Sequence, residues 1–569
     1  MQRVKKIIHS ATSTPKRKRT SLVIFLVICG LIAGGVWYWN YYKKSIIKNE
    51  VDKSLSKGTN GLYTIAYSKF NLDELGGSLL VDSVKLQYDS VVYNRMVDDN
   101  NAPSLLFKVF VPQLSLTGVQ TPKALIDKEV IGEKLQLLAP IIEIIYTGKG
   151  KDSTRNIPPE EVYRQLLSNL KLIRIKEIVI SNATLITRKK NSSDTSLQVH
   201  NLTVNLTDAL ISDSTVADTS RILFAKSVAL SIGRIEWLNK KKLYNYEVDN
   251  VILNSATRTL SLSAMKMVPQ LSENDFMTRV GLQIDRFNLA FDSIQFINVN
   301  VARFFKESIE ADSMVIHKAS IKVYKDHNQP RDNVNRVGTF PHQIIQKLPV
   351  SINIRKAYLA NAFIEYKQNT PKTGQKGMVQ FYNASAVIDN ITNQPEAIKA
   401  NKICRADARC MFMNIASMRA SFFFNLASDN GAFSVDGHLG EFNAEKLNFI
   451  TLPLVAAKVE KGIIHGVDMK ITGSDYVGHG TVTMLYEDLK ISVLEKNEDD
   501  GKLDKKKLVS MAANIIIKNN NPGSDGKARI GTGEFQRDTN RGFFNLVWKS
   551  LFVALSDNIG APAKSTPKK

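Results

Sequence analysis

The sequence predicts a mainly β body that follows an N-terminal transmembrane helix. Three observations support this fold class: apolar and polar residues alternate in short segments along most of the 569 residues, helical patterns are few, and one apolar run without charges lies near the N-terminus. Alternation with a period of two is typical of strands that bury one face. We therefore expect on the order of 20 to 25 strands.

The apolar run has the length of a membrane-spanning helix. Leu22–Trp39 contains eighteen residues without charge, which as a helix measure about 27 Å, close to the hydrocarbon thickness of a bilayer. Seven Lys and Arg residues precede the run and three closely follow it, so the positive-inside rule places the N-terminus in the cytoplasm. An aromatic belt marks the outer end: Trp37, Tyr38, Trp39, Tyr41 and Tyr42.

This pattern predicts a cytoplasmic basic segment at 1–20, a signal anchor at 21–42 and a body outside the cytoplasm. A cleaved signal peptide is the alternative, but the run is long for one and ends in bulky aromatic residues. No second apolar run of comparable length follows, which favours a single-pass protein.

The charge of the chain suggests anionic partners without selecting one. The formal net charge is +22, and the sequence after residue 20 still carries +15. A basic body favours lipid headgroups, anionic glycans or nucleic acid. Because the Lys and Arg residues are dispersed, a solvated basic surface explains them equally well.

Cysteines offer little chemistry. Of the three, Cys29 lies in the apolar run, whereas Cys404 and Cys410 lie six residues apart. In one straight strand these two would be about 20 Å apart, too far for a disulfide. A turn between them would permit one outside the cytoplasm, and no zinc or CxxC redox pattern is present.

The clearest strand patterns identify residues that we expect on the apolar side of the sheet. Such a face must be covered, either by a second sheet, by closure into a barrel, by helices, or by curling of one long sheet into a gutter. The pattern alone leaves these alternatives open. The residues are Val84, Leu86, Leu202, Val204, Leu206, Ile321, Val323, Phe422, Phe424, Val482 and Met484.

Helical patterns are expected in three places. One begins at Pro158, and another spans 443–458 with Pro453 inside it. Near the C-terminus, an amphipathic helix could pack onto the sheet, cap an open apolar end or touch a membrane. Flanking Asp538 and Asp557 favour packing or capping. Its apolar face comprises Phe544, Val547, Trp548, Leu551, Phe552 and Leu555.

Short stretches of the body repeat. Ile173-x-Ile175, followed by a segment with Asn182, recurs 179 residues later as Ile352-x-Ile354, followed by a segment with Asn361. Repetition in the same order at a similar offset indicates a duplicated β module. Charged and turn residues near 148–156, 325–340 and 495–507 suggest breaks.

No catalytic motif is recognisable, and we expect no enzyme. The eight histidines form no HxxH or HExxH pair, and the sequence lacks a nucleophile elbow, a P-loop and a GxGxxG motif. His438, His465 and His479 each neighbour glycine, a setting more typical of surface residues than of metal ligands. An envelope hydrolase that uses His327 and Asp332 is the least favoured alternative.

Two ordered sets of segments resemble one family. After the transmembrane run come Thr59–Ile65 and Gly77–Val81; toward the C-terminus come Phe433–Gly437, Lys461–Ile464 and Gly480–Lys490. These sets resemble the two ends of AsmA-like proteins (AsmA- and TamB-type) of Gram-negative envelopes, relatives of bridge-like lipid-transfer proteins. The resemblance covers about a third of the chain.

The resemblance implies the gutter among the four alternatives: an elongated, curled antiparallel β-sheet groove of repeated modules with a few short helices. Residues 51–340 would form N-terminal groove modules and 341–495 the AsmA-like C-terminal β region. Residues 496–569 would form a charged loop, the last strand and the amphipathic helix. The apolar residues named for the sheet would then face lipid.

The resemblance also implies a function. We expect an inner-membrane-anchored periplasmic protein that guides phospholipids through this groove for outer-membrane lipid homeostasis. Its partners would be phospholipids, the inner membrane and an outer-membrane or periplasmic protein, without nucleic acid or a cofactor. The alternative is a non-enzymatic envelope scaffold or outer-membrane assembly factor whose groove is filled by its own side chains.

Overall fold

A computed structural model of the chain describes residues 61–73, 76–120, 127–148, 171–192, 195–212, 215, 218, 220–239, 241–371, 373–496, 503–505 and 517–561. The expected anchor Leu22–Trp39 and the helix expected at Pro158 lie outside these residues. Within them, no helix combines the length and apolar character needed to cross a membrane.

The protein is mainly β, with 59% of the described residues in strands and 14% in helices. Its chain divides into two compact units. The N-terminal unit comprises Gln2–Met265 with Ile297–Glu307, and the C-terminal unit comprises Lys266–Phe296 with Ser308–Lys569. Strand β11 (Thr259–Pro269) contributes residues to both units.

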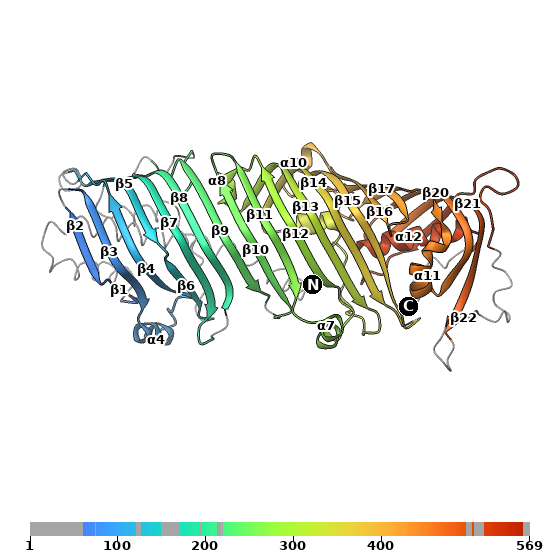
Figure 1. The fold of residues 1–569 in the computed structure, drawn as a ribbon, viewed down its shortest axis with the longest axis horizontal. Coiled ribbons are helices and arrows are strands. Elements are labelled where there is room, and N and C mark those ends of the chain that lie inside the picture. The colour runs from blue at the N-terminus through green and yellow to red at the C-terminus, as the bar shows by residue number, and fades with distance from the viewer. Residues whose placement is uncertain are drawn as a thin grey trace. The chain divides into compact units, whose positions relative to one another are not determined.

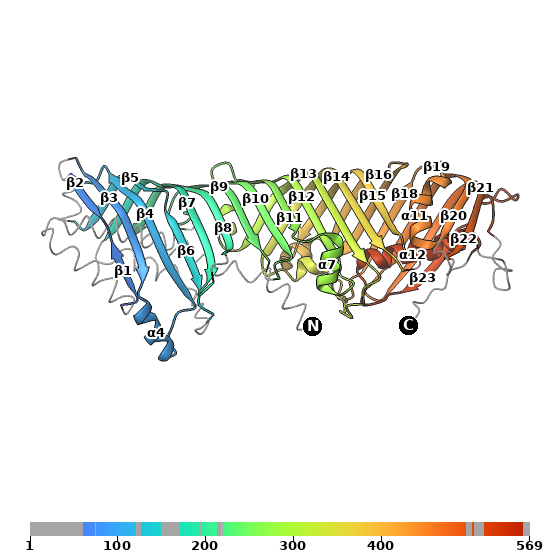
Figure 2. The same ribbon diagram turned by 60° about the horizontal axis from the view of Figure 1, so that its bottom comes forward.

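The N-terminal unit is a mixed sheet, drawn from blue to green in Figure 1. Strands β3 and β4 pair antiparallel, β5 and β6 both pair antiparallel with β4 and parallel with β7, and β7 to β10 continue antiparallel. Helix α4 links β3 to β4 at their ends (Figure 2). The elements are β1 (Tyr63–Ala66), β2 (Lys69–Asp73), β3 (Ser78–Tyr88), α4 (Ser90–Asp98), β4 (Leu105–Thr117), β5 (Glu129–Leu138), β6 (Ile141–Tyr146), β7 (Leu172–Lys189), β8 (Thr195–Ser212), β9 (Ser227–Leu238), β10 (Tyr244–Asn254) and α8 (Val301–Phe304).

The C-terminal unit is also a mixed sheet. Strand β13 pairs parallel with β14, after which β14 to β18, β20, β21 and β23 pair antiparallel in turn. The elements are α7 (Glu273–Val280), β12 (Arg286–Ile297), β13 (Ser308–Asp326), α9 (Pro341–Gln346), β14 (Ser351–Asn369), β15 (Lys376–Thr392), α10 (Pro395–Ala400), β16 (Ile403–Phe412), β17 (Ala416–Asn425), β18 (Phe433–Leu439), β19 (Phe442–Asn443), the 3-10 helix η3 (Ala444–Leu447), α11 (Asn448–Val455), β20 (Ala457–Gly473), β21 (Val477–Lys496), β22 (Leu503–Lys505), β23 (Gly531–Gln536) and α12 (Phe543–Asn558).

The expectation of a purely antiparallel sheet is wrong, because β5 and β6 run parallel to β7, and β13 runs parallel to β14. Apolar–polar alternation marks a strand with one buried face but carries no information about the direction of its neighbour. A parallel pair needs a crossover connection. Between β13 and β14 this connection is the segment 327–350, which the sequence pattern indicated only as a break.

Paired strands of the C-terminal unit align apolar residues in rows across the sheet. Directly paired residues project from the same face, and the next residues along each strand project from the other. One apolar row joins Ile316, Leu359, Ala386, Ala408, Ala420, Gly437, Met469 and Val482. The next row, on the opposite face, is mostly polar: in it, Asp407 accepts a hydrogen bond from Ser421 and forms an ion pair with Arg405.

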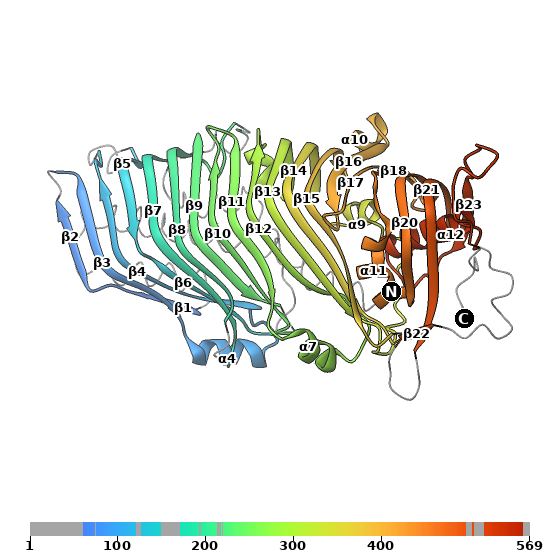
Figure 3. The same cartoon turned by 45° about the vertical axis from the view of Figure 1, so that its right-hand side comes forward.

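Helix α12 covers the apolar face over β21 and β23, as Figure 3 shows. Glycines in these strands permit a close approach: a Cβ on Gly480 would lie 2.5 Å from the backbone oxygen of Ser550, and one on Gly533 2.4 Å from a Val553 methyl carbon. Phe543, Leu546 and Val553 pack with residues of β16 to β18, β20 and β23. The helix thus closes this part of the apolar face.

The asparagines of the sequence repeat adopt the same backbone conformation in both units. Asn182 in β7 and Asn361 in β14 have φ of 54° and 56°, and Asn201 and Asn383 in their antiparallel partner strands have φ of 54° and 51°. Each pairing shifts register next to these residues. Asparagine tolerates the left-handed region better than most residues, so the same local irregularity recurs in the two repeated segments.

Candidate functional site

In the N-terminal unit, the residues expected to face lipid belong to a packed core. Five of these residues are buried and belong to one cluster of apolar side chains that extends from β3 to β9: Val84, Leu86, Leu202, Val204 and Leu206. Burial of this extent means that side chains of the unit itself cover them. These five side chains therefore offer no exposed surface to a lipid.

In the C-terminal unit, the expected residues fall into two groups. Phe424, Val482 and Met484 are buried in the clusters beneath α12. Ile321, Val323 and Phe422 are only half-buried. The first group lies where α12 covers the sheet, Phe422 packs against the edge of the same cluster, and Ile321 and Val323 lie in β13.

A half-buried apolar face extends over β12 to β16. In one cluster of described residues on this face the fully buried members are small, namely Ala319, Ala362 and Ala384, and the larger side chains around them remain partly accessible. By register, the face continues along the row of Leu359, Ala386, Ala408 and Ala420 toward the core under α12. The larger side chains are Phe291, Ile316, Ile321, Leu359, Ile364 and Cys410.

Helix α12 places its expected apolar face away from the closest contact with the sheet. Phe544 is 70% exposed and Trp548 46% exposed, Phe552 is half-buried and within ring contact of Trp548, and Val547, Leu551 and Leu555 pack partly against the core. The residues set deepest against the sheet are instead Phe543, Leu546, Ser550, Val553 and Ala554.

The half-buried apolar face changes to a polar cluster toward the ends of β13 and β14. Alternation along β13 places Ile321, Val323 and Lys325 on one face, and along β14 it places Ile364 and Tyr366 there. Lys325 is buried, and its Nζ donates to Asp285 at 3.1 Å. An apolar surface thus ends in charged and hydroxyl groups.

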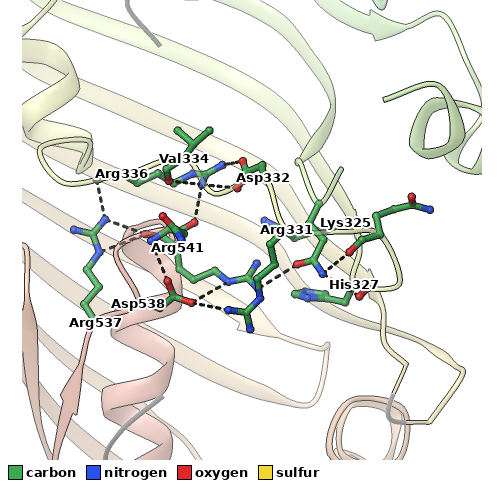
Figure 4. Close-up of polar contacts among 12 residues, drawn as sticks. Lys325, His327, Arg331, Asp332, Val334, Arg336, Arg537, Asp538 and Arg541 are labelled. Carbon is green, nitrogen blue, oxygen red and sulfur yellow. Dashed lines mark hydrogen bonds and ion pairs between the residues drawn. The ribbon is translucent and has the colours of Figure 1, made fainter. Parts of the chain in front are cut away.

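The polar cluster is completed by the crossover segment and by the residues just before α12 (Figure 4). Arg336 forms an ion pair with Asp332 and donates to the backbone oxygens of Val334 and Asn540. Arg537 donates to Asp475 at 3.0 Å and to the backbone oxygens of Arg336 and Arg541. These contacts hold the crossover segment against the strand–helix connection.

Arg541 has weaker partners than the other two arginines. Its Nη2 donates to Gln283 at 3.1 Å, and its Nε lies 3.8 Å from Asp538, which also accepts from Arg331 at 3.4 Å. Its Nη1 forms no hydrogen bond or ion pair with a described residue. The guanidinium therefore keeps donor capacity for another group.

His327 lies in a positive environment. Burial, and then the charges of Arg541 and Lys325, lower its pKa to about 4, so the imidazole is neutral near pH 7. Burial also raises the pKa of the Tyr366 hydroxyl, which makes no hydrogen bond with the residues described. Asp332, the other residue of the hydrolase alternative, is engaged by Arg336.

The three histidines that neighbour glycine in the sequence each pair with different carboxylates and do not form one metal site. His438 pairs with Asp468, His465 with Glu441 and Glu487, and His479 with Glu534. Among the residues that the structure covers, no group of three or more His, Cys, Asp or Glu side chains is placed to hold a metal ion.

Cys404 and Cys410 are both free and share strand β16. A continuous strand separates the two Cα atoms by about 20 Å, and no turn intervenes. Burial raises the pKa of both thiols, which disfavours reactive thiolates.

Sequence reasoning missed the polar cluster because its arginines pair with residues far away in the chain: Arg537 and Asp475 are 62 residues apart, and Arg541 and Gln283 258. The available signal was the pair of arginines, Arg537 and Arg541, just before the C-terminal amphipathic helix. No protein-family model matches the chain, and a search of the curated proteins finds no similar sequence.

Proposed function

We propose that the protein binds and guides phospholipids, with acyl chains lying on the half-buried apolar face of the C-terminal unit. The observation that carries this proposal is the row of Ile316, Leu359, Ala386 and Ala408, whose side chains are apolar yet only partly covered. An apolar surface of this kind favours an apolar ligand, since its contact with water is costly.

The wider proposal places this activity in a bacterial envelope. The N-terminal anchor would hold the protein in the inner membrane with its body in the periplasm, and the resemblance of sequence segments to AsmA-like proteins suggests a role in outer-membrane lipid homeostasis. The mechanism is passive guidance along a groove, with no covalent step.

A matched pair of variants tests the proposal. Ala408→Trp fills the apolar row with a large side chain, whereas Val387→Trp places the same side chain one row away, on the opposite face, where Val387 pairs with Asp407. The full-length protein and both variants are purified in detergent, and bound lipid is extracted and quantified by mass spectrometry. We expect phospholipid with the wild type and Val387→Trp, and clearly less with Ala408→Trp.

The packed core of the N-terminal unit favours a second candidate, a non-enzymatic envelope scaffold. Val84, Val204 and their neighbours leave that core filled by the protein's own side chains. If the wild type is folded and monodisperse but carries no phospholipid, lipid binding is rejected and the scaffold is preferred. Equal lipid in both tryptophan variants would reject the assignment of the acyl chains to this face.

A further inference from the structure

The half-buried apolar face ends in groups that suit an anion. Tyr366 follows Ile364 by two residues on the same face of β14, and Lys325 follows Val323 likewise on β13. A ligand whose apolar part lay along Ile321 and Ile364 would bring its polar end to these side chains.

The charged groups at the polar end of the half-buried apolar face do not sum to zero. Arg336 is paired with Asp332 and Arg537 with Asp475, which neutralises both couples. The remaining groups are three cations, Lys325, Arg331 and Arg541, and two carboxylates, Asp285 and Asp538. One positive charge is left over in a partly buried setting, where interactions between charges are screened less than at the surface.

Two donors are available to a ligand. Arg541 is 16% exposed at its side chain, and its Nη1 donates to none of the described residues, while Asp538 lies at the long distance of 3.8 Å from Nε. The Tyr366 hydroxyl likewise has no partner among the residues covered by the structure. The charges of Asp285 and Arg541 both act on the pKa of Tyr366, so the hydroxyl lies near the Arg541 guanidinium. A guanidinium beside a hydroxyl suits phosphate recognition.

His327 lies near the same charged groups. Burial is the main cause that lowers its pKa, the charges of Arg541 and Lys325 lower it further, and Asp285 acts in the opposite direction. The two cations favour a negative charge near this position.

We propose that Arg541, Tyr366 and Lys325 form an anion subsite that binds the phosphate of a glycerophospholipid whose acyl chains lie on the half-buried apolar face. This inference rests on the proposed lipid-binding function and adds headgroup recognition to it. Each phosphate oxygen accepts hydrogen bonds, and the subsite distinguishes phospholipids from neutral lipids with the same acyl chains.

The test measures binding of two fluorescent lipids with identical chains, a phosphatidic acid and a diacylglycerol, to the full-length protein in detergent. Tyr366→Phe removes one hydroxyl that makes no hydrogen bond with a described residue, so we expect it to leave the fold intact. Arg541→Gln removes the charge. Arg405→Gln is the control, since Arg405 pairs with Asp407 on the opposite face of the sheet.

We expect phosphatidic acid to bind about tenfold more weakly to Arg541→Gln and a few-fold more weakly to Tyr366→Phe, as for the loss of a charged and a neutral hydrogen bond. Diacylglycerol binding and the control stay unchanged. Inorganic phosphate then competes only with phosphatidic acid, and only at concentrations far above that of the lipid.

Equal binding of phosphatidic acid to the wild type and Arg541→Gln would overturn the subsite and leave lipid binding intact. Inorganic phosphate that binds through Arg541, while lipid affinity does not depend on Arg541, would identify a free-anion site and also overturn the headgroup assignment. Failure of both lipids to bind the wild type would instead reject the proposed function itself.

Discussion

Arg537 and Asp475 form an ion pair whose side chains are only 1% and 2% exposed, with Nη1 3.0 Å from Oδ1. Asp475 also accepts from the backbone amide of Gly338 and from Gln343, and the Arg537 guanidinium lies 4.4 Å from the ring centroid of Phe340. One carboxylate thus ties the crossover segment, α9 and the connection to α12 together.

We predict that Asp475→Asn destabilises the C-terminal unit by about 3–5 kcal/mol, because it leaves the Arg537 charge buried without a counter-ion. Urea unfolding followed by circular dichroism measures the change. Asp407→Asn serves as the control, since its pair with the half-exposed Arg405 is worth about 1 kcal/mol or less. Equal losses for the two variants would contradict the special role of the buried pair.

Acid should destabilise the protein through two histidines. Burial, and next the charges of Arg541 and Lys325, lower the pKa of His327 to about 4; burial lowers the pKa of His342 to about 4, although Asp475 acts in the opposite direction. An unfolded histidine titrates near 6.5, so the unfolded state binds protons first as the pH falls. Stability is therefore fully present above pH about 6.5 and is lost between that pH and about 4.

His342→Phe isolates one part of this effect. His342 is buried, stacks on Phe424 with centroids 5.1 Å apart, and has no hydrogen-bond partner at either ring nitrogen within the part of the chain described. We expect the variant to lose less stability than the wild type between pH 7 and 5, by on the order of 1–2 kcal/mol. His317→Gln, at an exposed position, should follow the wild type, and an unchanged pH profile in His342→Phe would refute the prediction.

The packing of α12 on the sheet can be tested through the strand glycines that it contacts. In Gly480→Ala the new Cβ would meet the Ser550 backbone oxygen at 2.5 Å, so the helix must shift. We expect a loss of about 1–3 kcal/mol and a change in the fluorescence of Trp548. In Gly466→Ala the nearest atoms are 3.7 Å away, so both signals should remain close to wild type.

These glycines also show how far sequence reasoning reaches. The positions of strands such as β8 and β21 follow from alternation, and the helix that became α12 follows from its periodic apolar residues. The face of α12 that contacts the sheet cannot be predicted in this way, because large side chains such as Trp548 dominate a hydrophobic pattern. The contact is instead made by Ser550 and Ala554 against strand glycines, a complementarity that only the packed structure reveals.

Burial is the other quantity that alternation leaves open. Val204 and Ile321 both occupy apolar positions in equally regular strands, yet Val204 is buried in a packed core and Ile321 is half-buried. What differs is the structure packed against each residue: Val204 lies in a large cluster of buried side chains, whereas the buried residues beside Ile321 are three alanines. A local pattern contains no information about these neighbours.

The repeated asparagines give a final prediction. Asn361 has φ of 56° where the pairing of β14 with β15 shifts register, and Asn182 has φ of 54° at the corresponding shift between β7 and β8. For a residue such as alanine, this left-handed conformation costs about 1 kcal/mol or more, because its Cβ lies too close to the backbone, whereas glycine adopts it freely. We expect Asn361→Ala to lower the free energy of unfolding by about 1 kcal/mol and Asn361→Gly to leave it within a few tenths, with the same order at Asn182. Urea unfolding of the four variants measures this; an alanine variant as stable as its glycine counterpart would mean that the strand relaxes and the left-handed residue is dispensable.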